Sequence, residues 1–308
     1  MGRVVILGVF VADATFRAAR QPRMGETLLG EGFALGPGGK GSNQAVAAAR
    51  AGAEVHMITR LGRDTFADMA HRVWAEAGVT PAVIVDPAGA TGAAGIFVEA
   101  GTGENAIVIC PGVAADLGAA DVEAAADLIG GAAVFVTQLE QPLAAAVRGL
   151  DLARAGGALT VLNPAPATGP LPDGVLSSCD FVTPNETEAA ALTGLPVTSP
   201  EDALAAAAAL RAAGAGAAIV TLGAQGALFH DATRTVHVPA FAAGPVVETT
   251  GAGDAFNGGF AAGLARGLDP VAATRRGCAA AAISVTRPGT AASMPTAREI
   301  EALLADAI

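Results

Sequence analysis

The sequence predicts a doubly wound α/β fold, in which a mostly parallel sheet carries helices on both faces. Two observations support this. Short β-branched segments that end at a turn residue alternate with helical segments along almost all of the 308 residues. Several of the helical segments begin at Ser, Asp or Pro and end at Gly, as helix caps require. Strands that alternate with helices pair in parallel and are covered on both faces.

The expected elements follow from this alternation. We expect buried strands at residues 3–9, 54–60, 133–139, 158–163, 180–185 and 217–223. We expect helices at residues 42–52, 64–78, 121–129, 142–157 and 200–214. Alanine runs within these helices favour the helical state by propensity.

Two segments interrupt the alternation, at residues 14–36 and 93–110. The second contains two β-rich runs around the turn sequence GTGEN, which predicts a hairpin. We expect a small second sheet, formed by about residues 12–38 and 92–110, as a lid over the carboxyl ends of the main strands. Residues 1–308 are expected to form one domain, without an internal repeat.

Composition narrows the class of protein. The chain is 52% hydrophobic and 15% charged, which is typical of a globular enzyme, and its net charge of −11 argues against a nucleic-acid partner. The apolar N-terminal run is too short to span a membrane and lacks a signal-peptide cleavage site. Cys110, Cys179 and Cys278 are far apart in the sequence and predict reduced thiols. A soluble cytoplasmic protein without a membrane partner is therefore expected.

The segment VVETTGAGDAFNGGF, residues 246–260, places Asp254 in a glycine-rich turn before a helix expected to begin near Ala252. Such a helix start offers free N–H groups and a positive dipole end to an anion. A dinucleotide fingerprint is excluded, because Phe256 stands where its third glycine belongs. Asp254 is then either a helix-capping acid or a general base, which takes a hydroxyl proton while the N–H groups hold a phosphoryl group.

A second glycine-rich segment, GPGGKGSNQAVAAAR, covers residues 36–50. A P-loop is excluded, because Gly41 follows Lys40 where Ser or Thr is required, and Ala34 stands where its first glycine belongs. The segment is either a plain helix entry or a close approach of backbone to ligand, with Lys40, Ser42 and Asn43 as its polar groups.

A third motif, TPNETEAAALTG at residues 183–194, places Asn185, Glu186 and Glu188 at a strand end and a helix start. These groups either cap the helix or hold a hydrated Mg²⁺ through water. The four histidines show no zinc-binding spacing, and no G-x-S-x-G elbow indicates a serine hydrolase.

Taken together, the motifs resemble the ribokinase-like family of carbohydrate kinases, of the phosphofructokinase-B type, from end to end of the chain. The segments that carry the resemblance are PRMGET, GPGGKGSNQAVAAARAGAEV, QLEQP, LNPAPA, TPNETEA, TLGAQGAL, GAGDAFNGGF and ISVTRPGT. The resemblance implies a doubly wound domain with a β lid, usually dimeric through the lids. It also implies ATP-dependent phosphorylation of the primary hydroxyl of a sugar, with D-ribose as the expected substrate and Mg²⁺ and K⁺ as cofactors.

The resemblance also implies roles for individual residues. Asp254 is the implied base, and Gly251, Ala252 and Gly253 are the implied anion hole. The implied sugar contacts are Asp13, Gly39, Lys40, Asn43, Glu140 and Asp254. The implied nucleotide contacts are Asn185, Thr221, Gly223, Gly226 and residues 251–253, and Glu188 orders Mg²⁺ through water. The implied K⁺ loop uses Glu248, Thr250, Ser284, Arg287, Gly289 and Ser293, largely through backbone carbonyls.

Three positions depart from the family pattern. Val11 replaces an expected Asn, Glu248 replaces an expected Asp, and Cys278 replaces a His often found near the adenine. Losing an amide that pairs with a hydroxyl weakens one contact and favours a deoxygenated or different sugar.

Two alternative functions stay open, and Val11 supports the first of them. A kinase for another sugar or a nucleoside stays open, although no aromatic residue stands in the loops around Gly39 and Asn43 to stack on a base. A non-catalytic sugar-binding protein also stays open, although the intact GAGD segment argues against it. The preferred sugar, activation by K⁺ and the oligomeric state are left open by the sequence.

Overall fold

A computed structural model describes residues 2–306, and its main feature is a nine-stranded sheet with the order β13-β12-β11-β10-β9-β8-β1-β4-β5. The strands are β1 (Arg3–Leu7), β4 (Glu54–Leu61), β5 (Val79–Val85), β8 (Val134–Thr137), β9 (Leu159–Leu162), β10 (Phe181–Val182), β11 (Ala217–Thr221), β12 (Ala227–His230) and β13 (Thr235–Val238). From β11 to β5 every neighbouring pair is parallel. The six predicted buried strands are confirmed, and β5, β12 and β13, at the two edges, were not predicted.

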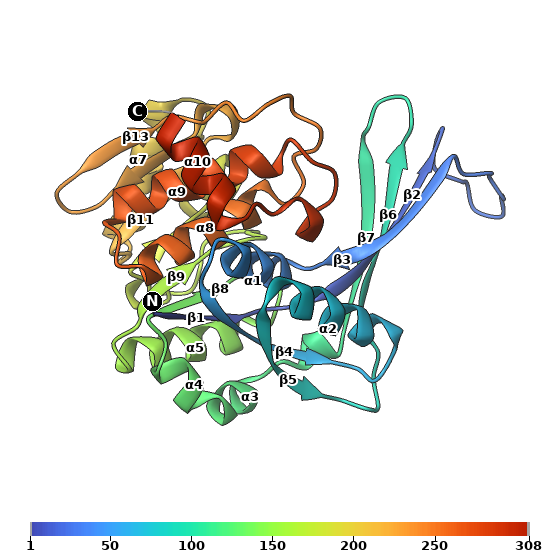
Figure 1. Cartoon of the computed structure of the whole chain (residues 1–308), viewed down its shortest axis with the longest axis horizontal. Helices are drawn as coiled ribbons and strands as arrows, with labels where there is room; N and C mark the ends of the chain where they lie inside the picture. The colour runs from blue at the N-terminus through green and yellow to red at the C-terminus, as the bar shows by residue number, and fades with distance from the viewer. Residues whose placement is uncertain (1, 307–308) are drawn as a thin grey trace.

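Helices cover both faces of this sheet (Figure 1), so the predicted doubly wound architecture is confirmed. One face carries α1 (Lys40–Arg50), α2 (Thr65–Ala77), α8 (Ala252–Ala265), α9 (Pro270–Ser284) and α10 (Ala297–Asp306). The other carries α3 (Ala119–Ala124), α4 (Ala126–Gly130), α5 (Leu143–Ala155), α6 (Glu186–Thr193) and α7 (Pro200–Ala212). Short 3₁₀ turns η1 (Val113–Asp116), η2 (Leu176–Ser178), η3 (Gly223–Gln225) and η4 (Ala291–Ser293) complete the elements.

Strand β1 shows why two helical layers are needed. Val4 and Ile6 enter the hydrophobic core under α1 and α8, whereas Val5 and Leu7 enter the core under α5. Because successive side chains of a strand point to opposite faces, a run of consecutive apolar residues requires cover on both sides. The four residues are fully buried, as the predicted buried strand requires.

Helix ends follow the capping signals of the sequence. The Asp64 carboxylate accepts from the N–H groups of Phe66 and Ala67 at the start of α2, and Gly78 ends that helix with φ 80°. The helix predicted at residues 121–129 is observed as α3 and α4, which are separated at Ala125. No helix within residues 2–306 has the length and apolar character to cross a membrane.

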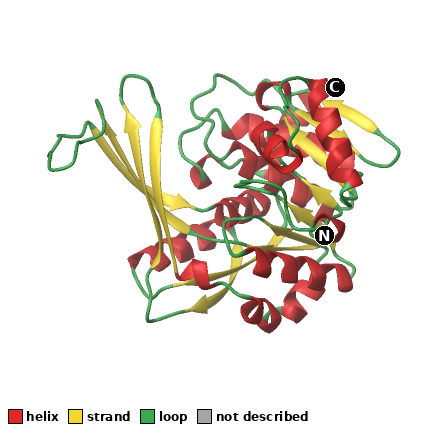
Figure 2. Ribbon diagram, turned by 180° about the vertical axis from the view of Figure 1, so that it is seen from behind, coloured by secondary structure: helices red, strands yellow, loops and turns green. Residues whose placement is uncertain are grey.

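A second sheet of four strands, in the order β3-β2-β6-β7, projects from the body of the molecule (Figures 1 and 2). Its strands are β2 (Val11–Ala18), β3 (Gly32–Gly38), β6 (Thr91–Glu99) and β7 (Asn105–Gly112). Strands β6 and β7 are antiparallel, which confirms the predicted hairpin. We call these four strands the small sheet.

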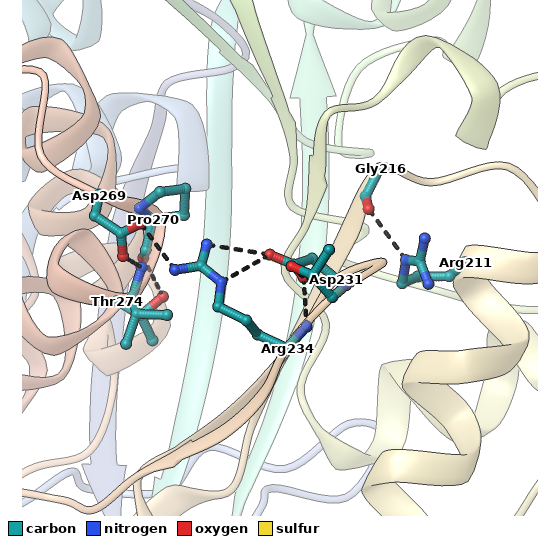
Figure 3. Close-up of polar contacts among 9 residues, drawn as sticks. Arg211, Gly216, Asp231, Arg234, Asp269, Pro270 and Thr274 are labelled. Atoms are coloured by element: carbon teal, nitrogen blue, oxygen red, sulfur yellow. Dashed lines mark hydrogen bonds and ion pairs between the residues drawn. The ribbon is translucent and has the colours of Figure 1, made fainter.

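The edge hairpin β12–β13 is tied to the helix layer by one arginine. Arg234 lies between Asp231 and Asp269 (Figure 3), with its guanidinium nitrogens 3.1 Å and 2.9 Å from the two carboxylates. Asp269 also caps α9, because its carboxylate accepts from the N–H of Val271. The contact therefore links the edge of the main sheet to the start of α9, whose far end leads into the predicted cation loop.

Candidate active site

The carboxyl ends of the parallel strands meet the starts of α1, α6 and α8 around one cavity of about 150 Å³. It is lined by Lys40, Asn163, Ala165, Thr183, Asn185, Glu188, Thr221, Gly251, Gly253, Asp254 and Asn257. Seven of these eleven residues were predicted as site residues from the sequence, in four segments far apart along the chain. The fold therefore brings the predicted glycine-rich turns and the Asn185–Glu188 motif together.

The start of α8 presents unpaired backbone donors. Gly251 precedes the helix with φ 82°, and no side chain caps this end. The Ala252 N–H donates to Thr249 O at 3.2 Å, whereas within residues 2–306 the N–H groups of Gly253 and Asp254 have no acceptor. These two groups lie at the positive end of the helix dipole, an arrangement that suits an anion. The helix start predicted near Ala252 is confirmed, but the free donors belong to residues 253 and 254.

The Asp254 carboxylate is buried and does not cap its own helix. Its Oδ2 accepts from Asn43 Nδ2 and its Oδ1 from Gln44 Nε2, each at 3.0 Å. Burial raises the pKa of Asp254, while the charge of Lys40 and the two amide donors lower it in part. Of the two hypotheses for Asp254, side-chain capping is wrong, and a carboxylate held beside free N–H groups is what the structure contains.

Further ionisable groups lie near Asp254. The backbone N–H of Lys40 donates to Glu140 Oε2 at 2.7 Å. Burial raises the pKa of Glu140 to about 7, and burial together with the charge of Asp254 raises the pKa of Asp13 to about 6. Burial lowers the pKa of Lys40, but the carboxylates of Asp254, Glu140 and Glu188 outweigh this effect and raise it overall. Lys40 is therefore held charged among several acids.

Glycines before α1 let the backbone approach these groups. A Cβ at Gly38 would lie 2.1 Å from the Asp13 carboxylate, and one at Gly39 would lie 2.6 Å from Val9 O. Gly39 also has φ 86°, which side chains rarely adopt. The segment therefore packs closely against the protein's own backbone and Asp13, and it leads directly into α1, whereas approach to a ligand stays a prediction.

The Asn185–Glu188 motif forms a reciprocal capping box. Asn185 Oδ1 accepts from the Glu188 N–H at 2.8 Å, and Glu188 Oε2 accepts from the Asn185 N–H at 3.0 Å. Burial raises the pKa of Glu188. The capping interpretation is confirmed, and both side chains also line the cavity. A single half-buried carboxylate suits Mg²⁺ that is held through water and phosphates.

The remaining predicted nucleotide contacts lie beside Thr221. Asn185 pairs with Thr221, the last residue of β11, as an isolated bridge. Gly223 and Gly226 bound the turn η3, with φ 51° and 93°. A Cβ at Gly226 would lie 2.0 Å from Val238 O, so this turn requires glycine. Neither glycine lines the cavity of about 150 Å³.

The predicted K⁺ residues lie on two loops that are joined directly. The N–H groups of Val247 and Glu248 donate to Val285 O, and Glu248 Oε2 accepts from the Gly289 N–H at 2.8 Å. The hydroxyls of Ser284 and Ser293 donate to carbonyls in their own turns, and Arg287 pairs with Glu299. Thr250 directly precedes Gly251. The longer Glu248 side chain therefore braces the two loops against each other.

Four lining residues were missed, namely Asn163, Ala165, Thr183 and Asn257. They fall inside the motifs LNPAPA, TPNETEA and GAGDAFNGGF, and Asn257 lies three residues after Asp254 on the same helix face. Within residues 2–306, no group of three or more His, Cys, Asp or Glu is placed to hold a metal ion.

Two departures from the family pattern are also located. Val11 is buried on β2 and lies on the same strand face as Asp13, two residues further on. Cys278 is packed into the core on α9, and burial raises the pKa of its thiol to about 12.

Comparison with known proteins agrees with this geometry. Residues 1–297 match the pfkB family of carbohydrate kinases. A deoxyribokinase of Salmonella typhi is 37% identical over 302 residues, which cover 98% of both chains, and a ribokinase of Haemophilus influenzae is 37% identical over 297 residues, 96% of both chains. The structure of Arabidopsis thaliana ribokinase complexed with ribose and ATP superposes with a TM-score of 0.90 at 27% identity, over 98% of each chain. The chain therefore belongs to the pfkB family of carbohydrate kinases and is an ATP-dependent sugar kinase.

Proposed function

We propose that the protein transfers the γ-phosphoryl group of ATP to the primary hydroxyl of D-ribose, giving D-ribose 5-phosphate and ADP, with Asp254 as general base. The observation that carries the proposal is the carboxylate of Asp254 beside the unpaired N–H groups of Gly253 and Asp254, in a cavity shared with Lys40. Relatives described as ribokinases from bacteria, mouse and yeast support ribose as the acceptor.

The reaction needs one proton transfer and one phosphoryl transfer. The sugar hydroxyl gives its proton to Asp254 as its oxygen forms a bond to the γ-phosphorus, and the bond to the β-phosphate oxygen breaks to release ADP. The N–H groups at the start of α8 and the ammonium of Lys40 stabilise the charge on the transferring group. The buried site also limits water, which competes with the sugar as acceptor.

The sugar and nucleotide occupy opposite sides of Asp254 in this proposal. Asp13, Gly39, Lys40, Asn43 and Glu140 surround the sugar. Asn43 supports this, because its Oδ1 is buried without a hydrogen-bond partner within residues 2–306 and suits a sugar hydroxyl. Asn185, Thr221, Gly223, Gly226 and residues 251–253 contact the nucleotide.

Two cations complete the proposed site. Mg²⁺, bound with the nucleotide, supplies positive charge to the phosphates, and Glu188 would hold it through water. Backbone carbonyls of the loops that contain Glu248, Thr250, Ser284, Arg287, Gly289 and Ser293 would hold K⁺. Activity in K⁺ at least twice that in Na⁺, at equal ionic strength, is the expected result, and equal activity would contradict the K⁺ site.

A second candidate substrate is 2-deoxy-D-ribose. Val11 supports it, because this buried apolar side chain shares a strand face with Asp13 and offers no partner to a sugar hydroxyl. The deoxyribokinase relatives, at 37% identity, support it as well.

Release of ADP, measured with D-ribose, 2-deoxy-D-ribose, fructose, adenosine and no sugar, tests both substrates. We expect turnover with D-ribose, and we expect Val11→Asn to raise kcat/KM for D-ribose relative to 2-deoxy-D-ribose by roughly tenfold, the worth of one hydrogen bond. A preference for 2-deoxy-D-ribose in the parent would move the assignment to the second candidate. No turnover with any acceptor, with ATP still bound, would favour a non-catalytic protein.

The small sheet acts in this proposal as the lid and as the contact between two subunits. Its pairing places Phe16 opposite Phe33 and Phe97, and Phe16, Phe33 and Val108 are 52%, 62% and 70% exposed. An apolar sheet of this kind is a common interaction surface. Light scattering should give a homodimer, and Phe16→Asp should give a monomer; a monomeric parent would contradict the proposal. Use of ATP and three free cysteines support a cytoplasmic location.

A further inference from the structure

The proposed base, Asp254, accepts a hydrogen bond from a buried side chain that does not line the cavity. Gln44, on α1, is fully buried, and its Nε2 lies 3.0 Å from Asp254 Oδ1. Its neighbour Asn43 holds the other carboxylate oxygen. One oxygen of Asp254 is therefore fixed by an amide with no direct access to a substrate.

The orientation of the Gln44 amide is determined by its other partners. Asn163 Nδ2 donates to the backbone oxygen of Thr183 at 3.0 Å, and a carbonyl can only accept, so Asn163 must turn its Oδ1 toward Gln44. On the other side, Gln138 Nε2 donates to Gln44 Oε1 at 2.6 Å. Gln44 must therefore present its NH₂ group to Asp254.

The residues that orient Gln44, directly or through Asn163, are anchored on the main sheet. Gln138, Asn163 and Thr183 directly follow β8, β9 and β10, three neighbouring strands of that sheet. Space for Gln138 depends on Gly8, where a Cβ would lie 2.3 Å from Gln138 Oε1. The rigid sheet edge therefore sets the direction of the hydrogen bond to Asp254.

We propose that Gln44 is a positioning residue for phosphoryl transfer: its oriented amide fixes Asp254 Oδ1 and favours the ionised carboxylate that accepts the hydroxyl proton. This proposal depends on the proposed role of Asp254 as base. An NH₂ donor stabilises a carboxylate more than a neutral carboxylic acid, because the hydrogen bond to a charged acceptor is stronger. Loss of the donor should therefore leave Asp254 protonated up to a higher pH.

Other ionisable groups face Asp254 and must be considered in a pH test. They are Lys40 of α1, Asp13 of β2, Glu140 after β8 and Glu188 of α6. A substitution at Gln44 leaves all four in place. A difference between the pH profiles of the variant and the parent therefore reports on the donor to Asp254.

The test is the pH dependence of kcat/KM for the sugar in Gln44→Met, which keeps the side-chain length and removes the donor. We expect the acid limb to move to higher pH, kcat/KM at pH 7 to fall by roughly tenfold to a hundredfold, and KM for ATP to stay within about twofold. Ser42→Ala is the matched control, because Ser42 is buried on the same helix and accepts from Trp74 Nε1 at 2.9 Å. It should lower Tm without moving the acid limb.

Two further variants keep the outcome decisive. An acid limb that stays in place in Gln44→Met, with an equal loss at every pH, would overturn the role of Gln44. If Gln44→Met does not fold, Gln138→Met is used instead. We expect its acid limb to move to higher pH by a smaller amount, and an acid limb that does not move would contradict the proposal. Asp254→Asn separates the two hypotheses, because turnover retained there would overturn the base assignment itself.

Discussion

The two sheets of this molecule differ in how far their apolar side chains are buried. The main sheet is covered on both faces, and every residue from Val4 to Leu7 of β1 is fully buried. All eight residues of β7 in the small sheet are exposed, including Ile107 and Ile109 at 51% and 56%. The proposed base and anion site are therefore mounted on the packed body, whereas Asp13 and Val11 lie on a strand that runs out into the projecting sheet.

In the proposed function, this difference assigns two tasks of a kinase to different parts of the molecule. Phosphoryl transfer needs groups held in fixed positions, which a close-packed sheet with helices provides. Sugar selection and exclusion of water suit a smaller element that moves relative to the body.

Removing the proposed base, Asp254, should have the largest effect. Asp254→Asn keeps the size of the side chain, but it can accept from only one of the two amide donors on α1 and cannot accept a proton, so kcat should fall on the order of 10³-fold or more. Titration calorimetry should give a Kd for ATP within about twofold of the parent, because the N–H groups of α8 remain. Turnover close to that of the parent would show that another group takes the proton.

Stability should respond differently in the two sheets. Ile6→Ala, in the centre of the main sheet, should lower the free energy of unfolding by about 2–5 kcal/mol, because it removes buried methyl groups and leaves a cavity. Ile109→Ala, on the exposed β7, should lower it by less than about 1 kcal/mol at low protein concentration. Urea denaturation measures both. Equal losses at low concentration would show that the small sheet is covered within one subunit.

The difference between the buried body and its exposed edges also explains which strands and helices could be predicted from the sequence. Buried strands and capped helices leave periodic and local signals, so residues 3–9 and the start of α2 at Asp64 were found directly. The edge strand β5 contains Pro81 and half-exposed residues, and such a strand carries a weak pattern. Its position depends on pairing with β4, which is a tertiary contact.

Only those site residues that stand in recognisable motifs could be predicted from the sequence. Lys40, Glu188 and Asp254 stand in recognisable motifs, and the fold places them around one cavity. The sequence left helix capping open as a role for Asp254. The direction of the Asp254 side chain depends on how α1 packs against α8, which is a tertiary contact. Gln44 carries no sequence signal of its own, since only three-dimensional contacts orient its amide.

The last prediction concerns a gain in stability at Glu140, where the body meets the proposed sugar site. Burial raises the pKa of Glu140 from its ordinary 4.5 to about 7, so the folded protein binds this proton more tightly than the unfolded chain. The resulting stability is present below about pH 4.5 and is lost as pH rises through about 7. Glu140→Gln resembles the neutral acid and should be more stable than the parent by about 1–3 kcal/mol at pH 8.5, with a smaller gain at pH 5.5.

Thermal unfolding at these two pH values measures the difference, and Glu76→Gln on the exposed face of α2 is the control for loss of one negative charge. The Gln side chain can still accept from the Lys40 N–H, so that contact need not be lost. A gain that is equal at both pH values would show that Glu140 does not titrate in this range. A pH-dependent gain with a raised KM for the sugar would instead mean that the site accepts a buried acid at a cost in stability, because the sugar requires it.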